Sequence, residues 1–177
     1  MTLNFLSQIK GRGRVCGSFL FFCIGEAMPN CKLSARDVAD YFLMSADAEF
    51  GENITNLKIQ KLVYYAQGFH LALNDGEPLF SERIRAWEHG PVVPDLYHDF
   101  KVSGAQPIPA PIDFDPLKYN DATQSLLDEV WSVYGQFSAS RLRDMTHAEP
   151  PWKETALNDE ISEELMQSYF KTLLVNG

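Results

Sequence analysis

The sequence predicts a mostly α-helical fold: a single compact domain of six or seven helices, with at most a short strand or hairpin near residues 80–88. Apolar residues recur at helical spacing in most segments from Ser34 onward. Residues that favour helix ends stand where these segments begin and end. The chain has 177 residues, of which 45% are hydrophobic, so one core can form without disulfides or a metal.

The first two helices are expected between residues 34 and 73. Ser34 is a suitable N-cap for a helix of about three turns. The apolar face of this helix consists of Ala35, Val38, Phe42 and Ala46. After a loop at residues 49–53, Thr55 or Asn56 can cap a longer helix. Its expected apolar stripe consists of Leu57, Leu62, Tyr65, Ala66, Phe69 and Leu73.

Several residues of the longer helix do not belong to this stripe. Lys58, Lys61 and Gln67 fall largely outside it. Gly68 costs under about 1 kcal/mol of helix stability relative to alanine and permits close packing. Residues 74–76, Asn-Asp-Gly, tolerate positive φ and are expected to end the helix.

The middle of the chain is predicted to be irregular. Residues 84–87 have room for one short strand, and residues 89–91, His-Gly-Pro, are expected to form a turn. Pro94 suits the first position of a short helix that ends at Phe100. Residues 103–116 contain four prolines and one glycine, which indicates the longest loop of the chain.

The last part of the chain is predicted to be helical again. Asp121 can cap a helix that ends at Gly135, and Ser138 can cap a shorter one. Residues 150–152, Pro-Pro-Trp, break the chain and start a new segment. Residues 161–166 fit a hydrophobic staple around an N-cap serine. The apolar stripe of the final helix is expected to consist of Leu165, Tyr169, Phe170 and Leu173.

Residues 1–27 are expected to lie outside the domain, which we place at residues 28–177. Basic residues precede an apolar run at 15–24, as in a secretory signal, and the run is too short to span a bilayer comfortably. The alternative is an upstream extension, with translation starting at Met28. The three cysteines, Cys16, Cys23 and Cys31, lack the spacing of a zinc site or a disulfide framework.

Charge and motifs argue against several functional classes. The formal net charge is −9, and such a protein repels nucleic acid and attracts a basic partner. On composition alone, the charge is explained more simply by solubility. The best candidate for a DNA-recognition helix carries only Lys58 and Lys61. The sequence lacks the phosphate-loop, dinucleotide, zinc-protease and serine-hydrolase motifs. We therefore expect no catalytic residues, no metal and no cofactor, with a hydrolase that uses His89 and His147 as an alternative.

Three ordered motifs are shared with a known family. Residues 55–68 read TNLKIQKLVYYAQG. A central motif at residues 86–94 reads AWEHGPVVP, with PLF at 78–80 before it and Leu96, Tyr97 and Phe100 after it. The closing motif consists of Tyr134, Gly135, Ser138, Leu142, Thr146, His147, Pro150 and Trp152. In this order the motifs cover about residues 34–157 and resemble the SocA-like family, also called the Panacea domain, whose members are often described as phage-associated proteins.

The resemblance implies an antitoxin that neutralises a protein toxin by direct contact in a bacterial or prophage toxin–antitoxin system. The toxin is then expected from the adjacent gene. An alternative is a proteolytic adaptor that presents a partner protein to a protease. The family is cytoplasmic, so the resemblance implies a cytoplasmic location without membrane contact and favours the upstream extension for residues 1–27.

The motifs also supply candidate partner-binding residues. These are Lys61, Tyr65, Trp87, His89, Gly90, Pro91, Val92, Tyr97, His147 and Trp152. Large aromatic side chains near proline-fixed turns suit the hot spots of an interface, although the charged neighbours of Trp87 favour a core position for this residue. Gly90 and Pro91 are expected to set backbone geometry. His89 and His147 either connect two halves of the domain by hydrogen bonds or line a shared binding groove.

Overall fold

The computed structural model describes residues 32–48 and 54–175. It confirms the mostly α-helical fold, because these residues form one compact domain of seven α-helices with a single two-stranded hairpin. None of the described helices is long and apolar enough to cross a membrane. The expectations for residues 1–27, for the three cysteines and for the loop at 49–53 lie outside the described residues, and the domain boundary at residue 28 stays a prediction.

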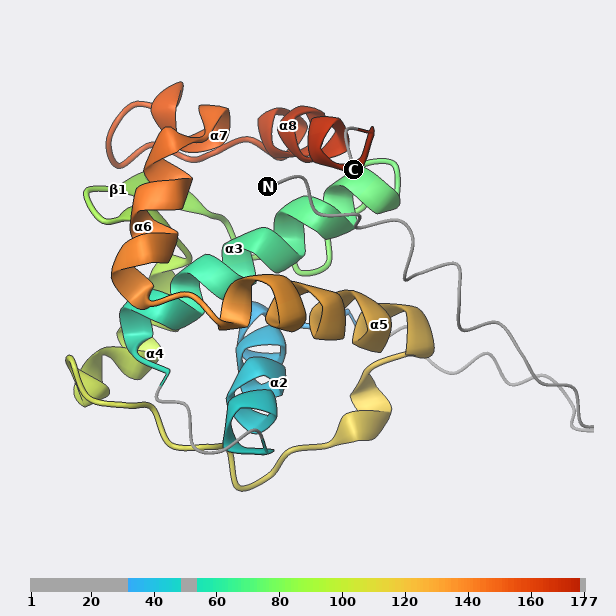
Figure 1. The fold of residues 1–177 in the computed structure, drawn as a ribbon, viewed down its shortest axis with the longest axis vertical. Helices are drawn as coiled ribbons and strands as arrows, with labels where there is room; N and C mark the ends of the chain where they lie inside the picture. Colours follow the sequence, from blue (N-terminus) through green and yellow to red (C-terminus); the bar gives the residue numbers. More distant parts are fainter. Residues whose placement is uncertain (1–31, 49–53, 176–177) are drawn as a thin grey trace, which may run out of the picture.

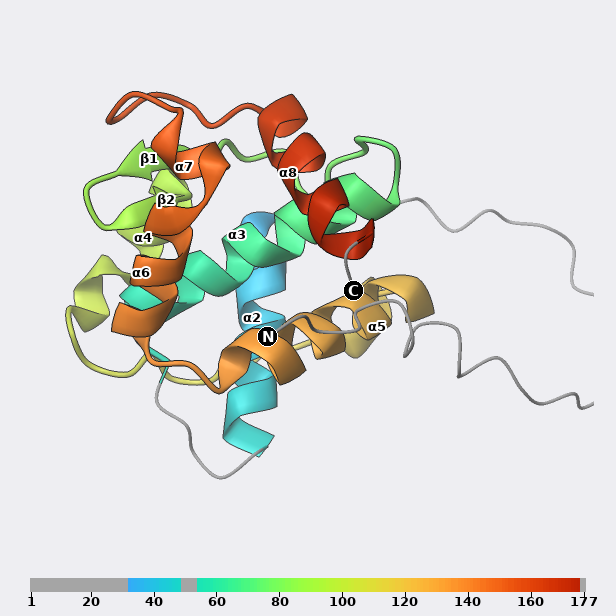
Figure 2. The same ribbon diagram turned by 45° about the horizontal axis from the view of Figure 1, so that its top comes forward.

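Helix α3 (Asn56–Leu73) is the central element of the fold. Figures 1 and 2 show it in the middle of the molecule, with α8 (Glu163–Val175) above it and α5 (Asp121–Val130) below it. Helix α2 (Ala35–Ala48) also contacts it. Fifteen of the 18 residues of α3 are buried, so this helix has no solvent face and differs from the one-sided helix that the sequence predicts.

The ends of α3 follow the predicted signals. The Thr55 hydroxyl accepts a hydrogen bond from the Lys58 backbone N–H and caps the first turn. After Leu73, Asp75 and Gly76 have φ values of 51° and 93°. Both residues therefore adopt the left-handed conformation that ends a helix.

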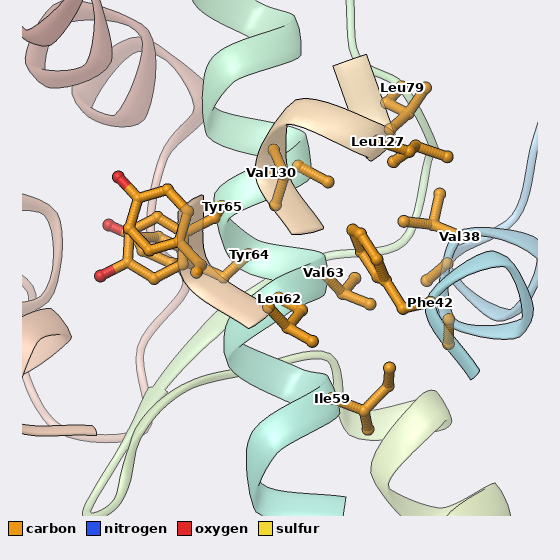
Figure 3. Close-up of a cluster of buried hydrophobic side chains, with 14 of the residues drawn as sticks. Val38, Phe42, Ile59, Leu62, Val63, Tyr64, Tyr65, Leu79, Leu127 and Val130 are labelled. Atoms are coloured by element: carbon orange, nitrogen blue, oxygen red, sulfur yellow. The ribbon is translucent and has the colours of Figure 1, made fainter. Parts of the chain in front are cut away.

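The apolar core lies between α2, α3 and α5. Figure 3 shows the side chains of Val38 and Phe42 from α2 pointing towards Val63 of α3. Leu127 and Val130 of α5 complete this cluster, and all five side chains are fully buried. Tyr64 and Tyr65 project from the opposite side of α3 (Figure 3), so the helix contributes side chains to one continuous core from both of these sides.

The predicted hairpin is confirmed and extends beyond residue 88. Strands β1 (Arg85–Trp87) and β2 (Gly90–Val92) pair antiparallel, with Trp87 opposite Gly90. The turn therefore consists of residues 88 and 89, one residue earlier than expected. The reason is that Gly90, with φ at 97°, follows the turn as the first residue of β2, as glycine does in a bulged hairpin loop.

Strand β1 has a second partner that the sequence did not indicate. The Ala86 N–H donates to the Asp159 carbonyl at 2.9 Å, and the Asn158 N–H donates to the Ala86 carbonyl at 2.7 Å. An isolated bridge joins Arg85 and Glu160. Residues 158–161 thus cover the outer edge of β1, and β2 is left as the other edge of this small sheet.

The remaining helices surround the N-terminal half of α3. Helices α4 (Pro94–Phe100), α6 (Ala139–Ala148) and α7 (Pro150–Lys153) lie with the hairpin on one side of the molecule in both ribbon views. Ser138 caps α6 as predicted, whereas the cap of α5 is Asn120 and not Asp121. A π-helix (Trp131–Gly135) ends α5, and short 3₁₀ helices (Lys101–Ser103 and Pro116–Lys118) flank the proline-rich loop.

The start of α8 confirms the hydrophobic staple. The Ser162 hydroxyl accepts from the Leu165 N–H, and Ile161 and Met166 are each 1% exposed. The buried stripe of α8 consists of Met166, Phe170 and Leu174. Leu165 and Leu173 are half-buried, so the predicted stripe is rotated by about one residue from the observed one.

Candidate protein-binding site

A half-open pocket of about 800 Å³ lies between the hairpin, the start of α3, and the second half of α4 with the segment that follows it. Its walls are mainly carbon, and Glu88 and Lys101 bring opposite charges to it. Four of the predicted site residues line it, namely Trp87, His89, Val92 and Tyr97. The pocket is formed by residues far apart in sequence, including Leu57 and Asn158.

Trp87 and Tyr97 form the aromatic wall of this pocket. Their rings meet edge to face, with centroids 5.1 Å apart and an interplanar angle of 69°. Both side chains are half-buried. The sequence favoured a core position for Trp87, and the structure corrects this, because the hairpin turns its ring towards Tyr97 at the surface.

Two polar side chains of α3 fix the backbone behind the pocket. The Asn56 amide donates to the Tyr97 carbonyl at 3.1 Å. The Gln60 side chain accepts from the Val93 N–H at 2.9 Å and donates to the Asn56 side chain at 3.1 Å. The middle of α4 and the residue after β2 are therefore both anchored to α3 by side-chain hydrogen bonds.

Three further polar residues of α3 are buried, contrary to the predicted position outside the apolar stripe. Lys58 donates to the Gly135 carbonyl at 2.5 Å, and Lys61 donates to the Pro91 carbonyl at 2.7 Å. Gln67 accepts from the Leu79 N–H at 2.9 Å. Each side chain bonds to a backbone group of a segment distant in sequence, which is why a polar residue is tolerated in the core.

Gly90 lies against Lys61 and Thr146. A Cβ added at Gly90 would lie 2.8 Å from Thr146 Oγ1 and 2.9 Å from Lys61 Cε. Its φ of 97° would also strain any residue with a side chain. Gly90 is therefore required both by the hairpin turn and by the close approach of β2 to α3 and α6.

Replacing Gly90 with alanine is expected to lower the free energy of unfolding by about 2 kcal/mol, from backbone strain and the clash together. Urea denaturation measures the change. Gly104→Ala is the matched control, because Gly104 also has positive φ and a Cβ there would meet no atom within 4 Å. Equal losses in the two variants would show that strain alone operates and that β2 does not approach α3 this closely.

His147 and Trp152 lie at the corner between α6 and α7. Their rings stack with centroids 3.9 Å apart, and Trp152 Nε1 donates to the Trp87 carbonyl at 2.9 Å. Burial lowers the pKa of His147, with further lowering from the charges of Lys61, Arg143 and His89. His147 Nε2 is buried without a hydrogen-bond partner among the described residues. The hydrogen bond between this corner and the hairpin is thus made by Trp152. The two histidines do not line a shared groove, because His89 lines the pocket and His147 does not.

Glu149 is a buried acid whose structural role the sequence does not indicate. Its carboxylate accepts from the Tyr65 hydroxyl at 2.8 Å and from the Tyr64 hydroxyl at 3.1 Å. Burial raises the pKa of Glu149 to about 7 against the opposing effect of hydrogen bonds from Tyr65, Tyr64 and Tyr169. A glutamate before two prolines has the appearance of a loop residue, so nothing local in the sequence indicates this cluster.

The ten candidate residues fall into three groups. Four line the pocket, and four are buried and do not line it, namely Lys61, Tyr65, Gly90 and Pro91. His147 and Trp152 are half-buried at the adjoining corner. A partner-binding role for these residues stays a prediction. Among the described residues, no group of three or more His, Cys, Asp or Glu side chains could hold a metal ion.

Comparison with known proteins identifies the family. The model of the family described as "Antitoxin SocA-like, Panacea domain" matches residues 59–153. Antitoxin SocA from Caulobacter vibrioides (strain NA1000 / CB15N) is 33% identical over 132 residues, which cover 68% of this chain and 69% of that protein. No solved structure matches the chain. The resemblance seen in the sequence is thereby confirmed, and the chain belongs to the SocA-like antitoxin family with a Panacea domain.

Proposed function

We propose that this chain is an antitoxin that binds its cognate protein toxin directly, in the bacterial cytoplasm. Family membership supports the antitoxin role. The structural observation that supports direct contact is the pocket with the aromatic wall of Trp87 and Tyr97. Half-buried aromatic rings on a rigid backbone are typical of the anchor residues of protein interfaces.

The backbone of this pocket is held in place before any partner binds. The hairpin is bonded to residues 158–161 on one edge, and Trp152 donates to the carbonyl of Trp87. Asn56 donates to the Tyr97 carbonyl in the middle of α4. Because little backbone ordering is then needed on binding, an apolar side chain of the toxin can enter the pocket at low entropic cost.

The charge of the domain indicates the kind of surface that surrounds this anchor. Residues 32–177 contain 12 basic and 23 acidic side chains, a net charge of −11. Complementary potentials accelerate association and favour correct partners. The proposed toxin therefore has a basic surface around an apolar or aromatic side chain.

Co-expression with the product of the adjacent gene tests this proposal. The neighbouring product alone is expected to stop growth, and the full chain is expected to restore growth and copurify with it. A neighbouring product that is harmless and does not bind the chain would remove the proposed function. Rescue without a complex would support neutralisation by another route and would exclude direct contact.

Trp87→Ala is expected to weaken toxin binding by about 30-fold, or about 2 kcal/mol, because it removes the larger anchor of the pocket. Isothermal titration calorimetry gives the dissociation constant, and circular dichroism checks that the variant is folded. Ile112→Ala is the matched control, since Ile112 is 99% exposed and does not line the pocket. Equal dissociation constants for the wild type and the Trp87 variant would place the toxin on another surface.

A further inference from the structure

We infer that Lys61 is a positioning residue of the pocket: its amine closes the outer edge of β2 and holds the hairpin against α3. Lys61 itself does not line the pocket, so it acts through the hairpin backbone. This inference rests on the proposed function in so far as it gives Lys61 an effect on toxin binding.

The pairing of the hairpin leaves one backbone group for Lys61 to satisfy. Pro91 lies opposite Ala86, and the N–H and C=O of Ala86 both bond to residues 158 and 159. The backbone of Pro91 therefore faces away from β1, towards α3. Proline has no N–H to donate, and its carbonyl accepts from Lys61 Nζ at 2.7 Å. Without this donor, a buried carbonyl would lose its hydrogen bond.

The burial of Lys61 is not explained by packing alone. Its side chain is fully buried, and burial lowers its pKa to about 7. Among the described residues no carboxylate pairs with it, and on the facing α6 the charge of Lys61 lowers the pKa of His147. An apolar side chain of similar length would fill the same space without desolvating an amine. The feature that only the amine provides is the hydrogen bond to Pro91.

The position of Pro91 links this hydrogen bond to the pocket. Its neighbour Val92 lines the pocket, and its other neighbour Gly90 pairs with Trp87. Gln60 fixes the chain at Val93, on the far side of Val92. Lys61 and Gln60 are thus two anchors on either side of Val92, and removing one lets β2 shift relative to α3.

The first experiment measures toxin affinity in the full chain. Lys61→Met keeps the length of the side chain and removes the donor, and we expect its dissociation constant for the adjacent gene product to rise about tenfold. In a Trp87→Ala background the same change is expected to have almost no further effect, because both variants act on the same wall. A residue with a merely structural role would give additive losses.

Lys58→Met is the matched control. Lys58 is also buried on α3, but its amine donates to Gly135, at the end of the π-helix. The control is expected to lower the melting temperature while the dissociation constant stays within about twofold. Equal loss of affinity in the two lysine variants, or full additivity of Lys61→Met with Trp87→Ala, would overturn the inference.

The second experiment needs no toxin. Hydrogen exchange of the free Lys61→Met chain is expected to accelerate at least about tenfold at the amides of Val92 and Val93, with α2 and α8 unchanged. Unchanged exchange in the hairpin, or faster exchange throughout, would overturn the positioning role, as would a variant that does not fold. If the wild type binds no adjacent gene product, the proposed function fails, and the exchange result still decides the role of Lys61.

Discussion

Gly68→Ala is expected to lower the free energy of unfolding by about 3 kcal/mol, although alanine favours a helix by about 1 kcal/mol over glycine. A Cβ at Gly68 would lie 2.5 Å from two ring carbons of Phe170, and Phe170 is fully buried. That ring also packs against Phe69 and Tyr64, with centroids 4.8 Å and 5.5 Å away. It therefore has no room to move, and the clash outweighs the gain in helix propensity.

Urea denaturation followed by circular dichroism measures this loss. The control is the double variant Gly68→Ala/Phe170→Leu, in which the smaller side chain makes room for the new methyl group. It is expected to lose less stability than the sum of the two single variants, because the two residues are in contact. A Gly68 variant as stable as the wild type would show that α8 does not pack this closely on α3.

Most helices of this fold could be predicted from the sequence, because their signals are local. Ser138 caps α6, Pro94 begins α4, and the staple at residues 161–166 begins α8. A cap or a staple depends only on residues within one or two turns, so its pattern is readable along the chain. The predicted hairpin turn began one residue later than the observed turn, because glycine can either form a turn or follow one.

The burial of polar residues could not be predicted in the same way. Lys61 and Gln67 have the periodicity of a solvent face, but their partners are backbone groups 30 and 12 residues away along the chain. Glu149 bonds to tyrosines more than 80 residues earlier. Periodicity measures polarity at each position and carries no information about such distant partners.

The candidate site could be predicted in part. The family motifs identified the residues of the pocket wall, including Trp87 and Tyr97. They could not separate wall residues from buried residues that do not line the pocket, because both belong to the same motifs. Tyr65, for example, is fully buried and bonds to Glu149 beneath the surface.

Glu149→Gln is expected to change the pH dependence of stability. In the folded chain burial raises the pKa of Glu149 from 4.5 to about 7. Between these values the folded state keeps a proton that the unfolded state releases, so the contribution of Glu149 to stability falls as pH rises from about 4.5 to about 7. The loss is on the order of 3 kcal/mol. Glutamine carries no charge, so the variant avoids this loss and becomes more stable than the wild type above about pH 7.

Urea denaturation of both chains at about pH 5 and about pH 8 measures the difference. Lys61→Met is the control, because its effect on stability changes with pH in a different range and with the opposite sign. Burial lowers the pKa of Lys61 from 10.5 to about 7. Below about pH 7 the amine is charged in both states, and the cost of burying the charge is present in full. As pH rises from about 7 to about 10.5, the buried amine is neutral, and this cost disappears. The stability of Lys61→Met relative to the wild type should therefore stay constant from about pH 5 to about pH 6 and decline only at higher pH. A Glu149→Gln chain that differs from the wild type by the same amount at both pH values would show that the tyrosine hydroxyls keep the carboxylate ionised in the core, and that burial does not control its charge.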